Sequence, residues 1–200
     1  MANPNLQGGL SVLSPSKGIG VPVNAYYLPS SYGIAMYIGD PAVITGTSNT
    51  AVYNGWKPGC LPEVNKATAG DGNKTTGVVV NFEIADYLNP QTKYHAASTE
   101  QIVYLADDPN TEFEIQADTS LAATDVGLNG VYIFGTASTI TGLSGVRLDT
   151  GATTPLAATA TFQLKVKRFS ANSMRNDAGN YCLAVVKINN HSFSNIVVGV

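Results

Sequence analysis

The sequence predicts an all-β fold, an antiparallel jelly-roll-like sandwich or barrel. Composition is the first reason, because Thr (19), Ser (14) and Asn (17) make up a quarter of the 200 residues and Gly (20) and Pro (10) add further turn formers. Charged residues are only 12%, about half the ~25% of an ordinary domain and too few for a helical bundle. Finally, about seven to nine short apolar or alternating segments are separated by turn residues, which is typical of sandwiches and barrels.

The first 27 residues differ from the rest of the chain. Residues 1–27 contain Pro4, Pro15 and Pro22 and four glycines, and they show no sustained hydrophobic period. Proline removes a backbone donor and favours extended conformations around it. We therefore expect an extended N-terminal arm apart from the globular core, either without fixed structure or lying on a partner. Residues 28–200 then form a single β domain.

The first half of this domain alternates between strands and turn-rich segments. An apolar run at 34–38 ends in a Gly-Asp-Pro turn and predicts a short strand. Residues 45–76 are mostly turn formers and predict a long loop, of a length that is often functional in compact domains. The Val-rich segment 77–84 predicts the strongest strand of this half, and 101–105 predicts another.

The second half shows clearer strand patterns. Residues 112–116 and 161–167 alternate between apolar and polar side chains, as expected for strands with one face in the core. Residues 181–188 are apolar on both faces for most of their length, which predicts a strand covered on both sides. Weaker predictions are strands at 130–134 and 143–148, a short helical segment at 121–128 and a last apolar segment at 195–200.

The charge balance is mildly acidic, with a net charge of −3 and a pI of about 5.2. Proteins that neutralise phosphates carry basic patches, so we expect no nucleic-acid partner. No apolar run approaches the ~18 residues of a membrane span, and the N-terminus lacks the pattern of a signal peptide. We therefore expect no membrane partner, synthesis in a cytoplasm, and free thiols at Cys60 and Cys182 that perform no chemistry.

Groups that could support catalysis are scarce. The two histidines, His95 and His191, lie in polar segments, and the chain contains no Gly-X-Ser-X-Gly or Cys-X-X-Cys motif. The acidic cluster at 107–114 has two interpretations, a hard-cation site or a turn followed by the solvated face of a strand. It lacks the ligand spacing of a calcium loop. The sequence predicts no enzymatic activity, no cofactor and no metal site.

Aromatic side chains gather early in the chain. Tyr and Trp are enriched in binding hot spots, and they also fill β cores while their polar atoms reach water, so an interface and a core both stay open. The apolar C-terminus is likewise either a contact face or a final edge strand. The predicted interface residues are Tyr26, Tyr27, Tyr32, Tyr37, Trp56, Ile196, Val197 and Val198.

Several turn-plus-strand segments resemble a known family. They are 28–41 (LPSSYGIAMYIGDP), 67–80 (ATAGDGNKTTGVVV), 105–116 (LADDPNTEFEIQ) and 187–193 (KINNHSF). In these segments the chain resembles capsid decoration proteins of tailed bacteriophages, also called cement or head-stabilising proteins. The resemblance runs over most of residues 28–193 and includes no active-site signature. Residues 1–27 and 45–76 depart from the segments that carry it.

The resemblance implies a structural protein of the virion. It would bind the outer surface of the assembled capsid, cement neighbouring major capsid protein subunits, and form homo-oligomers, with a trimer favoured over a dimer. It would be made in the cytoplasm of a bacterial host. The family also offers a second fold, a small tulip-type β-barrel, here with insertions at 45–76 and 135–155. The alternative function is a carbohydrate- or receptor-binding β-sandwich on the virion that uses the Tyr and Trp side chains.

Overall fold

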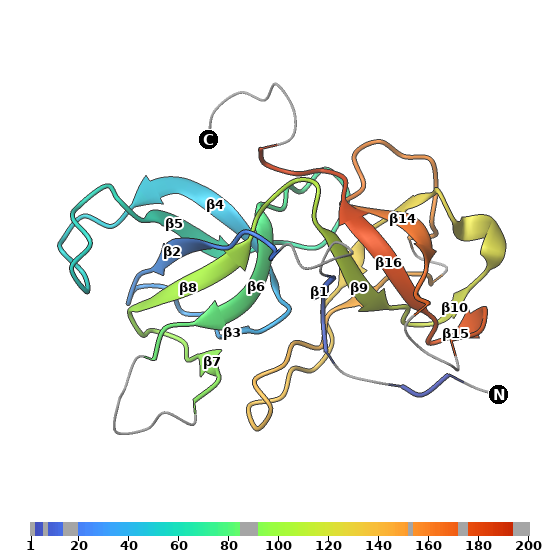
Figure 1. The fold of residues 1–200 in the computed structure, drawn as a ribbon, viewed down its shortest axis with the longest axis horizontal. Coiled ribbons are helices and arrows are strands. Elements are labelled where there is room, and N and C mark those ends of the chain that lie inside the picture. The colour runs from blue at the N-terminus through green and yellow to red at the C-terminus, as the bar shows by residue number, and fades with distance from the viewer. Residues whose placement is uncertain are drawn as a thin grey trace.

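The computed structural model describes residues 3–5, 8–13, 20–84, 92–151, 154–171 and 176–193. They form two β lobes that lie side by side (Figure 1). One lobe is a closed five-stranded barrel, and the other is built on an open five-stranded sheet. The predicted all-β fold with antiparallel sheets is confirmed. Within the described ranges the helical segment expected at 121–128 is reduced to one 3₁₀ turn, Ala123–Asp125.

The barrel is formed by the first half of the chain. Around it the strand order is β2-β5-β4-β6-β8, and its pairings are antiparallel except that between β2 and β5. Register shifts in β4 and β6 interrupt the ladders, and such bulges increase the bending that closure requires. The strands are β2 (Asn24–Leu28), β4 (Pro41–Ser48), β5 (Pro62–Lys66), β6 (Gly77–Phe82) and β8 (Gln101–Ala106).

The sheet of the second lobe has the order β1-β9-β16-β14-β11 and is antiparallel throughout. Its strands are β1 (Ser11–Leu13), β9 (Glu112–Gln116), β11 (Asn129–Gly130), β14 (Leu164–Phe169) and β16 (Leu183–Ile188). Three short pairs complete the fold: β3 (Met36–Tyr37) with β7 (Tyr94–His95), β10 (Ser120–Leu121) with β15 (Gly179–Asn180), and β12 (Tyr132–Ile133) with β13 (Arg147–Leu148).

The two hydrophobic cores share one wall. On β6, Val78 faces the core of the sheet lobe and the next residue, Val79, faces the core of the barrel. On β8, Ala106 likewise faces the core of the sheet lobe, and Leu105 faces the core of the barrel. Successive side chains of a strand point to opposite faces, so a strand buried on both faces needs an unbroken apolar run. The Val-rich segment predicted as a strand meets this requirement.

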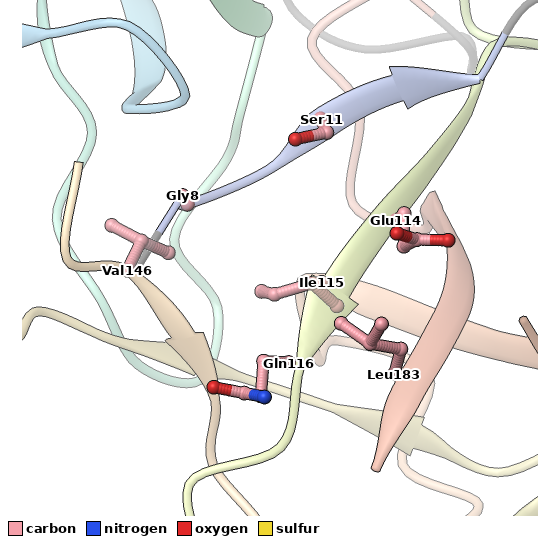
Figure 2. A pocket seen from close by; sticks show the side chains of 8 residues that line it. Gly8, Ser11, Glu114, Ile115, Gln116, Val146 and Leu183 are labelled. Atoms are coloured by element: carbon pink, nitrogen blue, oxygen red, sulfur yellow. The ribbon is translucent and has the colours of Figure 1, made fainter. Parts of the chain in front are cut away.

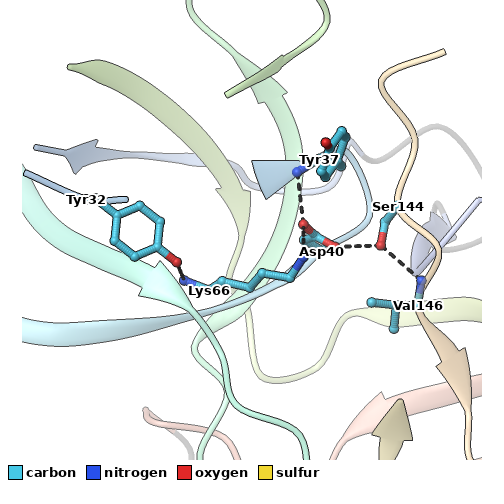
Figure 3. Close-up of polar contacts among 6 residues, drawn as sticks. All are labelled: Tyr32, Tyr37, Asp40, Lys66, Ser144 and Val146. Atoms are coloured by element: carbon cyan, nitrogen blue, oxygen red, sulfur yellow. Dashed lines mark hydrogen bonds and ion pairs between the residues drawn. The ribbon is translucent and has the colours of Figure 1, made fainter. Parts of the chain in front are cut away.

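A buried carboxylate joins the lobes (Figure 3). The side chain of Asp40, immediately before β4, is 1% exposed. It accepts hydrogen bonds from the Ser144 hydroxyl at 2.5 Å and from the backbone N–H of Tyr37 at 2.9 Å. The Lys66 ammonium lies 2.8 Å from the same carboxylate and 4.5 Å from the centre of the Phe134 ring. Ser144 and Phe134 belong to the second half of the chain, so this cluster holds that half against the barrel.

The predicted long loop at 45–76 is wrong in its extent, because the segment includes the end of β4 and all of β5. Of the five residues of β5, only Val64 is buried. A single apolar residue cannot show the alternation of apolar and polar residues that identifies a strand, so the hydrophobic pattern of the sequence does not predict β5. Its position is instead determined by pairing with β4 and β2.

The N-terminal segment packs more closely than expected. Its described parts are extended, but Leu10 is 2% exposed in the core of the sheet lobe, and β2 (Asn24–Leu28) is a barrel strand. Gly39 has a φ of +90°, and a Cβ there would lie 2.5 Å from the carbonyl oxygen of Gly8. Glycine at this position therefore allows the segment to approach the barrel, where the Leu10 N–H donates to the Gly39 carbonyl at 3.0 Å.

We predict that Asp40→Ala destabilises the protein by about 3–5 kcal/mol, because it leaves the half-buried Lys66 ammonium and the buried Ser144 hydroxyl without their acceptor. Chemical denaturation with a probe in each lobe measures this loss. The exposed Asp71 gives a matched control, since Asp71→Ala is expected to cost about 0.5 kcal/mol or less. Equal stability of the two variants would contradict the importance of the buried cluster.

Candidate interaction surface

The loop that joins β4 and β5 lies at one end of the molecule (Figure 1), and it exposes an aromatic side chain. Tyr53 and Trp56 exchange backbone hydrogen bonds of 3.1 and 2.8 Å around Asn54 and Gly55, whose φ angles are +44° and +82°. Asn-Gly with two positive φ angles is the preferred sequence of a tight two-residue hairpin turn. The turn leaves Trp56 42% exposed and Val52 66% exposed.

Asn49 organises the base of this loop. Its side chain is almost completely buried and donates to the carbonyls of Ala51 and Lys57 at 2.9 Å, while its amide oxygen accepts from the Leu61 N–H at 3.0 Å. The Asn49 side chain therefore adds to the backbone hydrogen bonds that Asn49 exchanges with Leu61 and Gly59. The exposed aromatic residues are thus held on a fixed support.

Two tyrosines extend the aromatic surface onto the barrel. The rings of Tyr27 and Tyr53 meet edge to face, with centroids 5.8 Å apart. Both hydroxyls donate to Glu100, that of Tyr27 to the carboxylate and that of Tyr53 to the backbone carbonyl at 2.9 Å. Burial, followed by the bond to Glu100, raises the pKa of Tyr27, and burial together with the charges of Glu100 and Glu83 raises the pKa of Tyr53. Both side chains are neutral hydrogen-bond donors at physiological pH.

Three carboxylates lie around the rings of Tyr27 and Tyr53, and each carboxylate accepts a hydrogen bond from a neutral side chain. Glu100 accepts from Tyr27, Glu83 accepts from the Asn54 amide at 2.8 Å, and Glu63 accepts from the Thr47 hydroxyl at 2.9 Å. We call this region the hairpin face. It consists of Tyr27, Val52, Tyr53, Trp56, Glu63, Glu83 and Glu100.

The predicted interface residues do not form one surface. Tyr27 and Trp56 lie on the hairpin face, whereas Tyr26 is buried and donates to Asp107 at 2.6 Å. Tyr32 packs against the barrel core, and Tyr37 stacks on Tyr94 with centroids 5.1 Å apart. Tyr26 and Tyr27 separate because neighbouring side chains of a strand point to opposite faces. The predicted contact residues Ile196, Val197 and Val198 lie outside the described residues.

Tyr53 and the three glutamates were not among the predicted interface residues. Asn54-Gly55 is a sequence signal for a tight hairpin and could have placed Tyr53 beside Trp56. The glutamates come from three separate segments of the chain, 63, 83 and 100, and no local pattern joins them.

A small pocket lies between the N-terminal strand and the sheet (Figure 2). Its volume is about 130 Å³, and its lining is mostly apolar with the carboxylate of Glu114 and the amide of Gln116 at the edge. The Gln116 amide donates to the carbonyls of Pro4 and Tyr181 at 2.8 and 3.0 Å, and the Ser170 hydroxyl donates to Glu114. The bond from Gln116 to Pro4 stabilises the contact of the N-terminal segment, and we assign no ligand to the pocket.

The two histidines are buried. The imidazole of His95 lies between the rings of Tyr32 and Phe82, with centroid distances of 6.1 and 6.4 Å. Its Nδ1 lies 3.1 Å from the Gln101 amide oxygen, and its Nε2 has no hydrogen-bond partner among the described residues. His191 is 1% exposed and its Nδ1 accepts from the Phe193 N–H at 3.0 Å. Burial lowers the pKa of both side chains below their ordinary value of 6.5.

No group of three or more His, Cys, Asp or Glu side chains in the described parts of the chain could hold a metal ion. The acidic cluster at 107–114 is instead a turn followed by a strand: Asp107 accepts from Tyr26 and Asn24, and Glu112 pairs with Lys167 and Arg168. No helix within those ranges is long and apolar enough to cross a membrane.

Comparisons with known proteins identify no relative. No model of a known protein family matches the chain. No curated protein matches it significantly, and neither does any solved structure.

We predict that the free energy of unfolding decreases as the pH falls below about 6.5. The folded state keeps both histidines neutral to a lower pH than the unfolded chain, so their contribution is complete above the unfolded pKa and is lost as pH falls toward the folded pKa. Each histidine contributes a slope of up to about 1.4 kcal/mol per pH unit. Urea denaturation between pH 8 and pH 5 measures it. A decline that is equally steep in a His95→Gln, His191→Gln double variant would exclude the histidines as its cause.

We also predict that one thiol per folded chain reacts with a water-soluble disulfide reagent. Cys60 is exposed in the β4–β5 loop, whereas Cys182 is buried and burial raises its pKa to about 11. Thiolate is the reactive form, so Cys182 should react only after unfolding. The Cys60→Ser variant provides the control and should show no fast reaction. Fast reaction of two thiols in the folded protein would contradict the structure around Cys182.

Proposed function

We propose that this protein is a structural component of a phage virion that binds the outer surface of the assembled capsid and cements neighbouring major capsid protein subunits. The observation that carries the proposal is the hairpin face, a fixed aromatic surface at one end of a rigid two-lobed β body. The resemblance of several segments to capsid decoration proteins supports the same role.

A cementing protein must resist deformation, and several features of the chain favour this property. The two cores share the β6–β8 wall, and the buried Asp40 cluster joins the barrel to residues 134–144. A load applied to one lobe is therefore transmitted to the other through buried contacts. A low content of charged residues also reduces the desolvation that docking on a protein surface requires.

The exposed aromatic residues are suited to a protein contact. Trp and Tyr provide large contact areas with few rotatable bonds, and they dominate binding energies at interfaces. Trp56 is projected by a tight turn and Tyr53 is fixed by its bond to Glu100, so little side-chain freedom is lost on docking. In this proposal the partner of the hairpin face or of neighbouring surfaces is the capsid lattice, and no catalysis is involved.

The same face also favours one alternative, a carbohydrate- or receptor-binding module. Aromatic rings beside carboxylates can stack on sugars and accept hydrogen bonds from their hydroxyls, and Tyr27, Trp56 and Glu100 provide both groups. Binding of the isolated protein to a glycan array would favour this alternative over the cementing role.

We predict that the protein binds capsid shells that lack it and raises their thermal stability. The double substitution Tyr53→Ala, Trp56→Ala should weaken this binding about 30-fold, because the loss of a hot spot costs about 2 kcal/mol of binding free energy. Co-sedimentation with expanded shells of the encoding phage measures the affinity. Ile140→Ala is a matched control, because Ile140 is 89% exposed on a different loop. Shells that neither bind the wild-type protein nor gain heat resistance from it would contradict the proposed function.

A further inference from the structure

The carboxylates of the hairpin face form no ion pair. In the described ranges the hydrogen-bond donors of Glu63, Glu83 and Glu100 are a threonine, an asparagine and a tyrosine. Lys57 is exposed in the same loop and forms no ion pair there, and Lys66, three residues after Glu63, pairs with Asp40 instead. Three carboxylates beside exposed aromatic rings favour a cationic partner, because cations bind both carboxylates and the faces of aromatic rings.

The outer face of the sheet lobe has the opposite charge. We call it the sheet face and define it by Lys165, Lys167, Arg168 and Lys187, with Glu112 and Glu114 on the neighbouring strand. A register shift between Val166 and Arg168 places two successive cations on one face, and both pair with Glu112, at 2.5 and 2.7 Å. One carboxylate therefore serves two cations.

Two lysines on the sheet face are directly opposite each other. Lys165 on β14 pairs in register with Lys187 on β16. Like charges in this position destabilise a sheet. The Lys187 ammonium donates to the neutral amide of Asn110 at 3.0 Å, and Lys165 is exposed and forms no ion pair within the described residues. Glu112 on β9 lies opposite Lys187 in register, but its carboxylate already pairs with Lys167 and Arg168, so the sheet face keeps an excess of positive charge, as expected of a surface that receives an acidic partner.

The two faces belong to different lobes. The hairpin face lies at the free end of the barrel, and β14 and β16 lie in the other lobe (Figure 1). Within one rigid molecule the two faces cannot meet. We propose that the hairpin face of one copy docks on the sheet face of a second copy. Such a contact joins two different surfaces head to tail, and repetition of it gives a closed ring or an extended chain.

The chemistry of this contact is complementary in detail. The carboxylates of Glu83 and Glu100 meet the ammonium groups of Lys165 and Lys187, which form no ion pair within the described residues. The rings of Tyr53 and Trp56 supply apolar area and can lie against the stems of the long basic side chains. The contact goes beyond the proposed capsid role, since it forms between copies of this chain alone. It uses the hairpin face that the capsid would also bind, so on any one copy the two contacts exclude each other.

Charge reversal with mixing tests the contact. We expect wild-type protein to self-associate at about 20 mM salt and to dissociate at about 500 mM, where charges are screened within about 4 Å. Glu83→Lys with Glu100→Lys, and separately Lys165→Glu with Lys187→Glu, should each raise the dissociation constant about tenfold or more. An equimolar mixture of the two variants should associate again, because each supplies the face that the other needs. Sedimentation velocity measures all four samples.

Trp56 provides a local readout, since it is the chain's one tryptophan. Its fluorescence should shift to shorter wavelength when the wild-type protein associates. Asp71→Lys, in an exposed turn outside both faces, is the matched control and should associate as the wild type does. Circular dichroism and thermal unfolding of each variant verify that the fold is retained.

Three results would overturn the proposal: a wild-type protein that stays monomeric at low salt, variants that associate as tightly as wild type, or a mixture that fails to recover. Binding of wild type to capsid shells is measured separately with the same samples. Shell binding without self-association would leave the proposed function intact and reject this contact. Self-association without shell binding would support this contact and contradict the proposed function.

Discussion

The wall formed by β6 and β8 is buried on both faces, and the arrangement of the whole molecule depends on this. Val79 and Leu105 fill the barrel while Val78 and Ala106 face the core of the sheet lobe. Neither lobe can lose this wall without exposing its own core to water. The cost of exposing a buried apolar side chain, about 1.5–3 kcal/mol each, therefore couples the stability of one lobe to that of the other. Asp40 adds a polar link at the same junction.

This shared wall joins the two lobes through buried contacts, and the lobes form the two ends of the molecule. The hairpin loop gains its shape from Asn49 and from the tight turn at Asn54 and Gly55, which are local devices. The charged sheet face gains its shape from strand register and from the bulge in β14. Both surfaces are fixed before any partner arrives, so docking on either requires little ordering of the chain.

The parts of the fold predicted from the sequence are those with a period of two or an unbroken apolar run. Residues 112–116 and the Val-rich segment at β6 are strands because their patterns match a half-buried and a fully buried strand. β5 was missed because Val64 is its single buried apolar residue. The division into two lobes was also missed. It depends on which core each face of β6 meets, and that depends on contacts with segments far along the chain.

The candidate surface was predictable only in part. Tyr27 and Trp56 were identified by residue type, but Tyr26 and Tyr32 have the same chemistry and point inward. Residue type cannot separate them, because the direction of a side chain follows from its position in the strand. The acidic component of the hairpin face is assembled from residues 63, 83 and 100 by the closure of the barrel.

The N-terminal segment has a consequence for how the chain folds. β1 pairs with β9, about a hundred residues later, and the Asn3 amide donates to the carbonyls of Asp177 and Asn180 at 2.8 and 2.9 Å. These N-terminal residues are therefore made well before the residues that they contact. The barrel, whose last strand is β8, can form before residues 177–188 are made, but the sheet lobe cannot. Such distant pairing makes the formation of the sheet lobe slow, and it leaves the edge of β9 that pairs with β16 unprotected until β16 has been made.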